Sequence, residues 1–220
     1  MKKSTKIGLQ SAGDKGGEAI PLSPHDRIVS AALVCMEQRG IESTGIRDIA
    51  REAGVNSAAI NYYFRSKDNL IRLAMEKSLE WTFGEIIDAL DNLTRNGMPL
   101  NDALTDVFEA FAADLYRAPR LSYAHLRDAL VDQRYDGPAV QQGNQFLSQL
   151  EERLALKNSN CDGEQLRLIL VQLWSSLMMT ALLPQLYDSF IPLQLDVKEC
   201  RSRYVRQLLQ PLFHFLASPA

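Results

Sequence analysis

The chain has 220 residues, of which 46% are hydrophobic and 23% charged, and its formal net charge is −3. This composition is typical of a globular protein with one or two domains, and it excludes a protein that binds polyanions over its whole surface. Residues 1–80 hold 12 Lys and Arg against 10 Asp and Glu (+2), and residues 81–220 hold 12 against 17 (−5). A phosphate-facing N-terminal part would give this asymmetry, and so would chance.

Cysteine usage and hydropathy point to a soluble cytoplasmic protein. Cys35, Cys161 and Cys200 are odd in number and far apart, which argues against a disulfide framework and against a clustered zinc site. The longest apolar segment, residues 168–183, is interrupted by polar residues and falls short of the roughly 20 residues that a membrane-spanning helix needs. We therefore expect no membrane partner, no metal and no cofactor.

The first 22 residues are rich in Gly, Lys and Ser and show no periodicity, so residues 1–22 are predicted to form a flexible arm. The first helix is expected to begin at Ser23, because Ser is a good cap, Pro24 suits the first helical position and Asp26 can close a capping box. Apolar residues follow at helical spacing, and Gly40 ends the helix.

Two short helices and a long one follow. Thr44 or Gly45 caps the second helix, and Gly54 supplies a left-handed turn out of it. Asn56 caps a third helix that reaches Phe64, in which the apolar Ile60 and Phe64 point inward. Ser66 then caps a long helix that extends to about residue 93.

The remainder reads as helix throughout, with no alternating strand pattern, so the fold class is predicted to be all-α. Pro184 is expected to kink or end one helix, and Pro211 lies awkwardly within the last one. The expected helices span residues 100–117, 119–132, 138–157, 163–187 and 196–217.

The third helix has an unusual surface for a soluble protein, because no formal charge lies between Asn56 and Phe64. The turn Ala53–Asn56 joins it to the second helix as in a helix-turn-helix motif. A helix that enters the major groove needs a narrow tip and hydrogen-bonding groups that are not heavily hydrated. This pattern predicts a DNA-reading helix.

Individual side chains suit that role. Ser57 and Ala58 allow close approach, and Asn61 can make a bidentate contact to adenine. Tyr62 and Tyr63 are long and hydroxyl-tipped, so they suit phosphates and thymine methyl groups, although Tyr63 can instead pack against the first helix. Positive charge beside the helix comes from Arg47, Arg65 and Lys67, which are placed to contact phosphate. Arg47 can alternatively pair with Glu52.

The segment TGIRDIAREAGVNSAAINYYFRSKDNLI, residues 44–71, resembles the DNA-binding segment of TetR-family transcriptional regulators. The resemblance covers about the first quarter of the chain. The family often has Ser or Thr where Gly45 stands and usually Tyr where Asn61 stands, which leaves the operator sequence open. Asn61 is added to the expected contacts from its own chemistry. Carried over by position, the family's usual DNA contacts fall on Thr44, Arg47, Asn56, Ser57, Ala58, Tyr62, Tyr63 and Lys67.

The resemblance implies three regions: the arm 1–22, a helix-turn-helix domain 23–66 and a helical effector-binding and dimerisation domain 67–220, of which 67–96 is a connecting helix. Helix 163–187 is apolar nearly all round, so it must bury a second face against something else. With the last helix it is expected to form a four-helix interface in a homodimer, and the alternative is a wholly internal core. The expected interface residues are Leu166, Leu170, Trp174, Leu177, Tyr204 and Leu208.

The family also implies a pocket for a small-molecule effector, which no motif identifies. Aromatic side chains at helical spacing are candidates to line it, although such residues can equally form the hydrophobic core. Arg127 can bind the effector or pair with Asp128. The candidate lining residues are Phe108, Phe111, Tyr123, His125, Arg127, Trp174 and Met178.

The expected function is that of a homodimeric repressor that a small molecule releases from a palindromic double-stranded DNA operator. The alternative is a helical module that acts through protein contacts without specific DNA binding. An enzyme is not expected, because His25, His125 and His214 lie far apart in the sequence and no nucleophile elbow, phosphate loop or HExxH motif is present.

Overall fold

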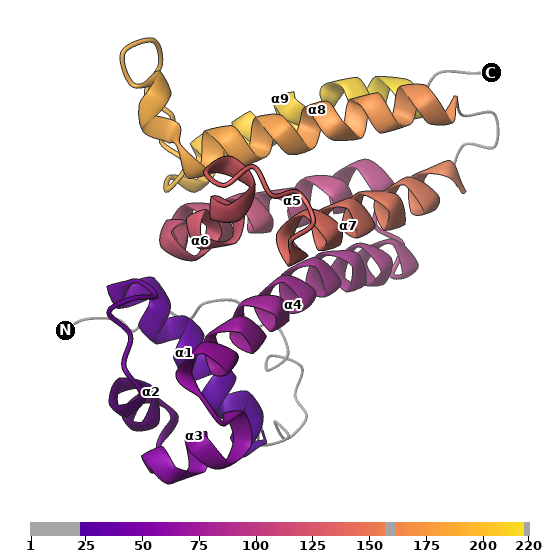
Figure 1. Ribbon diagram of the computed structural model, residues 1–220. Coiled ribbons are helices and arrows are strands. Elements are labelled where there is room, and N and C mark those ends of the chain that lie inside the picture. Colours follow the sequence, from indigo (N-terminus) through magenta and orange to yellow (C-terminus); the bar gives the residue numbers. More distant parts are fainter. Residues whose placement is uncertain (1–22, 157–161, 218–220) are drawn as a thin grey trace. The chain divides into compact units, whose positions relative to one another are not determined.

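The computed structural model describes residues 23–156 and 162–217, and the arm expected over residues 1–22 lies outside them. Within this part of the chain every regular element is a helix, as predicted (Figure 1). The chain divides into two compact units. Unit 1 comprises residues up to Thr82 together with Ala118–Ala139, and unit 2 comprises Phe83–Arg117 and the residues from Val140 onward.

Within residues 23–139, unit 1 contains three helices from the N-terminal part of the chain and one from much later in the sequence. The first part of α4, a helix over Lys67–Arg95, also belongs to it. The other helices are α1 (Pro24–Arg39), α2 (Ile46–Ala53), α3 (Ser57–Phe64) and α6 (Pro119–Leu130).

The predicted capping residues begin and end these helices. The Ser23 hydroxyl accepts the amide of Asp26 at 3.1 Å and donates to its carboxylate at 2.7 Å. Gly54 ends α2 in the left-handed region with φ +66°, which a residue with a Cβ adopts only at a cost. The Asn56 side chain accepts the amide of Ala59 at 2.8 Å and so caps α3.

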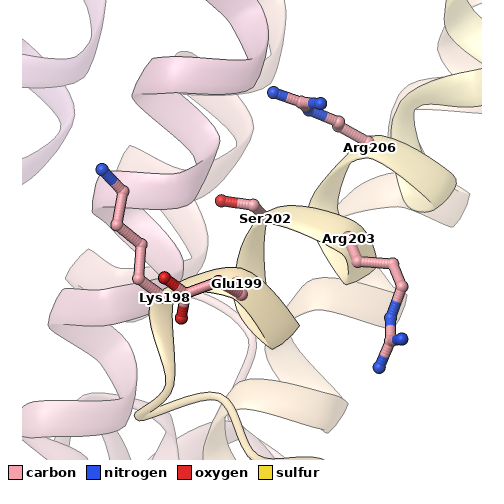
Figure 2. Close-up of a pocket in the computed structure, with 5 residues that line it drawn as sticks. All are labelled: Lys198, Glu199, Ser202, Arg203 and Arg206. Atoms are coloured by element: carbon pink, nitrogen blue, oxygen red, sulfur yellow. The ribbon is translucent and has the colours of Figure 1, made fainter.

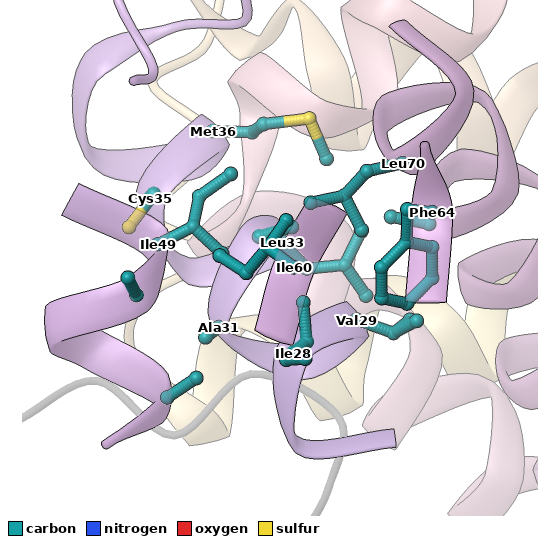
Figure 3. Packing of buried hydrophobic residues seen from close by; sticks show 14 of the residues in the cluster. Ile28, Val29, Ala31, Leu33, Cys35, Met36, Ile49, Ile60, Phe64 and Leu70 are labelled. Carbon is teal, nitrogen blue, oxygen red and sulfur yellow. The ribbon is translucent and has the colours of Figure 1, made fainter. Parts of the chain in front are cut away.

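The core of unit 1 is an apolar cluster in which α1, α2, α3 and α4 meet (Figure 3). Ile60 and Phe64, one helical turn apart on α3, are both buried in it, as predicted. Leu121 from α6 is a member of the same cluster. Complete burial of one such side chain contributes about 1.5–3 kcal/mol, so the cluster fixes the angles between these short helices.

The start of α6 is bound to the end of α1. The amide of Leu121 donates to a carboxylate oxygen of Glu37 at 2.8 Å, and the guanidinium group of Arg120 donates to the carbonyl of Gln38 at 2.8 Å. Residues more than 80 positions apart are thereby joined, which sequence periodicity cannot reveal.

In its described residues, unit 2 contains the second part of α4 and four further helices. Helix α5 packs against α8 and α9, and α8 packs against α9. Its core includes Phe108, Phe146, Leu150, Leu177 and Leu209. The elements are α5 (Leu100–Arg117), α7 (Pro138–Ala155), α8 (Gly163–Leu182), the 3₁₀ turn η1 (Pro184–Tyr187) and α9 (Lys198–Ala217).

Helix α8 ends at Leu182 rather than at residue 187, because Pro184 opens the separate turn η1. By length and composition alone, α8 could cross a membrane, a test that the core helix of a soluble protein also passes. Its buried residues Leu166, Leu170, Leu173 and Leu177 recur every three or four positions. Helix α8 therefore has one inward face, as a helix packed on the surface of a globular unit does.

Candidate nucleic-acid interface

Helix α3 presents an uncharged polar face to solvent. Tyr62 is 72% exposed and Tyr63 is 41% exposed. Ala58 and Asn61 are also exposed, whereas Ser57 is half-buried. These are the side chains that the sequence pattern placed on the outer face, and their chemistry suits the edges of bases and the phosphate backbone.

An aromatic contact joins α3 to the first turn of α1. The His25 ring stacks on Phe64, with centroids 4.7 Å apart, and meets Tyr63 edge to face at 6.2 Å. Tyr63 thus packs against the first helix and still exposes part of its ring. His25 is a site neighbour that sequence reasoning missed, because its only signal was its place at the capped end of a helix.

The link from α3 to α4 is a tight turn centred on Arg65, which has a φ of +66° and a ψ of −40°. The amide of Ser66 donates to the carbonyl of Phe64 at 2.7 Å, which closes a γ-turn across Arg65. The Asn69 side chain donates to the same carbonyl at 3.0 Å. A γ-turn of this hand is rare and strained for a residue with a side chain, so this exposed arginine is held in a costly conformation next to α3.

The cations expected beside α3 have different environments. Arg47 is exposed and, among the described residues, forms no ion pair, so the alternative pairing with Glu52 is not observed. Lys67 donates to the carbonyl of Glu42 at 3.2 Å and so also supports the loop between α1 and α2. Arg65 is likewise exposed and forms no ion pair within the described residues, so the two arginines have more freedom to bind a phosphate than Lys67 has.

Thr44 is completely buried, and its hydroxyl donates to the carbonyl of Gly40 at 2.8 Å. The expected DNA contact through its side chain is thereby wrong, because an internal hydrogen bond holds the hydroxyl away from the surface. Asn56 uses its side-chain oxygen to cap α3, which leaves its amide nitrogen as the group that could contact DNA. Gly45 precedes α2 without a side-chain cap.

The candidate effector residues fall into both compact units. Tyr123, His125 and Arg127 belong to unit 1, and the others, Phe108, Phe111, Trp174 and Met178, belong to unit 2. His125 Nε2 lies 2.9 Å from the Ser78 hydroxyl, and burial lowers the pKa of His125 to about 4. Asp128 pairs with Arg134 at 3.0 Å rather than with Arg127.

Trp174 lies in an aromatic cluster of unit 2. It stacks on Phe111, with centroids 5.7 Å apart, and also contacts Phe83 and Phe146 at 5.7 and 5.5 Å. Phe83 stacks on Phe146 at 5.0 Å, and sequence analysis missed it because it lies on the connecting helix. Trp174 is half-buried, and these ring contacts within its own unit argue against its assignment to the dimer interface.

The other expected interface residues are divided between the two faces of α8 and α9. Leu166, Leu170 and Leu177 are buried inside the subunit, so their assignment to an interface is wrong. Tyr204 hydrogen-bonds to the Thr180 hydroxyl of α8, and Leu208 is half-buried. The exposed apolar residues of α8 are instead Leu168, Val171 and Met179, so α8 is not wholly internal.

Comparisons with known proteins give different results for the N-terminal part of the chain and for the chain as a whole. Residues 28–74 match the family model for bacterial regulatory proteins of the tetR family. The HTH-type transcriptional repressor KstR2 of Mycolicibacterium smegmatis is 33% identical over 90 residues, which are 41% of this chain and 42% of that protein. The chain thus matches less than half the length of that relative.

Among solved structures, the fatty acid degradation regulator FadR from Bacillus halodurans has a TM-score of 0.61 at 17% identity, over 88% of this chain and 98% of its own. The multidrug binding protein EbrR, complexed with malachite green, has a TM-score of 0.57 at 20% identity, over 86% of this chain and 96% of its own. These similarities extend the shared fold well beyond the segment that the family model matches.

Proposed function

Residues 28–74 of this chain are a DNA-binding domain of the tetR family of bacterial regulatory proteins, and from that premise we propose that the chain is a homodimeric, cytoplasmic transcriptional repressor. Its operator is a palindromic duplex from which a small molecule releases it. The observation that carries the DNA-binding part is the exposed face of α3, which is uncharged, rich in hydrogen-bonding groups and flanked by arginine.

In this proposal α3 lies in the major groove. Asn61 and Ser57 read base edges, and Tyr62 and Tyr63 contact the sugar–phosphate backbone. Arg47 binds a phosphate beside the groove. A head of this size reads only a few base pairs, so tight binding needs two heads on half-sites that are related by the two-fold axis of the protein.

The outer face of α8 supports the homodimer. Leu168, Val171 and Met179 are exposed in the isolated chain, and their spacing of three and eight positions places them along one side of the helix. Covering them with the same face of a second copy would remove this apolar surface from water. The interface then consists of α8 and α9 from each subunit, with Leu208 and Tyr204 at its edge.

Effector binding is proposed from family membership and from the aromatic cluster around Trp174. The multidrug binding protein EbrR, which has a similar fold, forms a complex with malachite green, and flat aromatic walls suit apolar ligands. Release follows if the effector favours a dimer whose two heads no longer match the half-site spacing.

DNA from upstream of the gene itself tests this function. Fluorescence anisotropy should detect specific retention that weakens steeply as salt rises. Arg47→Ala should reduce the slope of log affinity against log salt by about 1, while Asn61→Ala should change the sequence selected from a random pool. Binding that is equal on operator and scrambled duplex would favour the helical interaction module instead.

The dimer has its own test. Val171→Asp places a charge in the proposed interface, so analytical ultracentrifugation should find monomers where the wild type is dimeric. Gln145→Asp makes the same charge change at an exposed position of α7, outside the proposed interface, and should leave the dimer intact. A wild-type protein that sediments as a monomer at micromolar concentration would contradict the homodimer.

A further inference from the structure

The connection between α8 and α9, residues 183–197, has an unusual surface. Leu186 is 60% exposed and Phe190 is 90% exposed, and Ile191 is also exposed. Figure 1 shows this connection projecting beyond the ends of the two helices. Single exposed apolar residues are ordinary, but three large ones within six positions indicate a surface that binds something.

The connection has a defined shape. The amides of Phe190 and Ile191 both donate to the carbonyl of Tyr187, at 2.9 and 2.7 Å. At its base Leu195 is buried, and Arg201 donates to the Leu195 carbonyl at 2.7 Å. The apolar tip is therefore presented by a preformed turn, which reduces the entropy lost when it binds.

An open groove of about 430 Å³ begins immediately after this connection, at the start of α9. All of its lining side chains come from α9 (Figure 2). Among the described residues, its three cations form no ion pair and no side-chain hydrogen bond with other parts of the chain. The lining residues are Lys198, Glu199, Ser202, Arg203 and Arg206.

The two surfaces are complementary in charge. The groove carries three cations and one carboxylate, a formal +2. Residues 184–197 carry Asp188 and Asp196 and no Lys or Arg, a formal −2. The flat guanidinium groups of Arg203 and Arg206 also suit the exposed ring of Phe190, because arginine stacks on aromatic faces.

Adjacent complementary surfaces on one chain are what a two-fold interface needs, since each surface then meets the other on the second copy. We propose that residues 184–197 form a docking arm that binds the α9 groove of a second copy of this chain, with Phe190 and Asp188 meeting Arg203 and Arg206. The exchange is reciprocal, so each dimer contains it twice. It rests on the proposed homodimer and adds a contact beyond the apolar face of α8.

Charge reversal tests the pairing. Asp188→Arg should raise the dissociation constant of the dimer about tenfold or more, because it acts at two equivalent contacts. Arg203→Asp or Arg206→Asp should weaken the dimer similarly, and one of these combined with Asp188→Arg should restore much of the affinity. Asp106→Arg makes the same charge change at an exposed position of α5 and should leave association unchanged.

Cross-linking tests the location. A photoreactive phenylalanine at position 190 is placed in unlabelled protein, which then exchanges subunits with ¹⁵N-labelled wild type. The expected product joins the unlabelled arm peptide to a ¹⁵N-labelled peptide from residues 198–206. Links that occur only within one chain, or to another region of the second copy, would overturn the docking arm.

The outcomes separate this inference from the proposed function. If Val171→Asp dissociates the dimer while Asp188→Arg and Phe190→Ala have no effect, the docking arm is wrong and the homodimer stands. If Arg203→Asp alters only the salt dependence of DNA binding, the groove binds phosphate and the arm is again wrong. A wild-type protein that is monomeric would contradict both the homodimer and the docking arm.

Discussion

The amide of Leu121 donates to the carboxylate of Glu37, so a side chain from α1 caps the first turn of α6. The residue at the N-cap position of α6, Ala118, has no side chain able to do so. Unpaired amides at a helix start favour a nearby anion. Glu37 supplies that anion from a helix more than 80 residues away in the sequence.

Removal of this cap should loosen unit 1. Glu37→Ala leaves the Leu121 amide without its acceptor and should lower the free energy of unfolding by about 1–2 kcal/mol. Glu37→Gln keeps an acceptor oxygen and should lose less than half as much. Urea denaturation gives the free energies, and hydrogen exchange at the Leu121 amide locates the change. Equal losses in the two variants would mean that the hydrogen bond is not what stabilises this contact.

The buried His125 predicts a pH dependence with a definite sign. Its folded pKa of about 4 lies below the ordinary value of 6.5, so below pH 6.5 the unfolded chain takes up a proton that the folded chain resists. Stability should therefore fall as pH drops from 6.5 to about 4, by roughly 1–3 kcal/mol from this group. His125→Gln should flatten that part of the profile, as followed by urea unfolding at several pH values. A profile that keeps its slope in His125→Gln would mean that another group causes the pH dependence.

Substitution of Arg65, which lies in the strained turn, should affect stability and DNA binding in different ways. Arg65→Gly should raise the free energy of unfolding by about 0.5–1 kcal/mol, because glycine adopts a positive φ without steric cost. The same change removes a cation beside α3 and should reduce the salt slope of operator binding by about 1. Arg65→Lys keeps the charge and the strain, so it should leave both measurements close to wild type. A less stable Arg65→Gly protein would mean that the arginine side chain makes a stabilising contact.

Asn56 combines two proposed roles that substitution can separate. Asn56→Ala removes the cap of α3 and should lower the free energy of unfolding by about 1 kcal/mol. Asn56→Asp keeps the cap and should preserve stability, yet it places a negative charge toward DNA phosphates and should weaken operator binding severalfold or more. Thermal unfolding and fluorescence anisotropy measure the two effects. If Asn56→Asp binds DNA like wild type, Asn56 lies away from the duplex.

Local features of unit 1 could be predicted from the sequence. Ser23, Asn56 and Ser66 each cap a helix through the residue three positions further on, and Gly54 takes the positive φ that a tight turn needs. Such contacts lie within a few residues, so capping preferences and periodicity are sufficient to find them. The inward position of Ile60 and Phe64 follows from the same spacing.

Long-range contacts could not be predicted in this way. Thr44 is a candidate cap and DNA contact by sequence, but it is completely buried and its hydroxyl donates to the carbonyl of Gly40. Helix α8 is apolar on several sides, so composition could not distinguish the buried Leu170 from the exposed Val171. The pairing of His125 with Ser78 joins residues 47 positions apart, and no local pattern indicates it.

Leu121 completes the apolar cluster of the helix-turn-helix segment although it lies far outside residues 28–74. A chimeric regulator could be made by joining this helix-turn-helix segment to another protein within the long helix α4. A junction after Thr82 would omit Leu121 and leave a leucine-sized cavity in the apolar cluster of the helix-turn-helix segment. A stable chimera must therefore include the first turn of α6, or an apolar side chain of the other protein must fill that cavity.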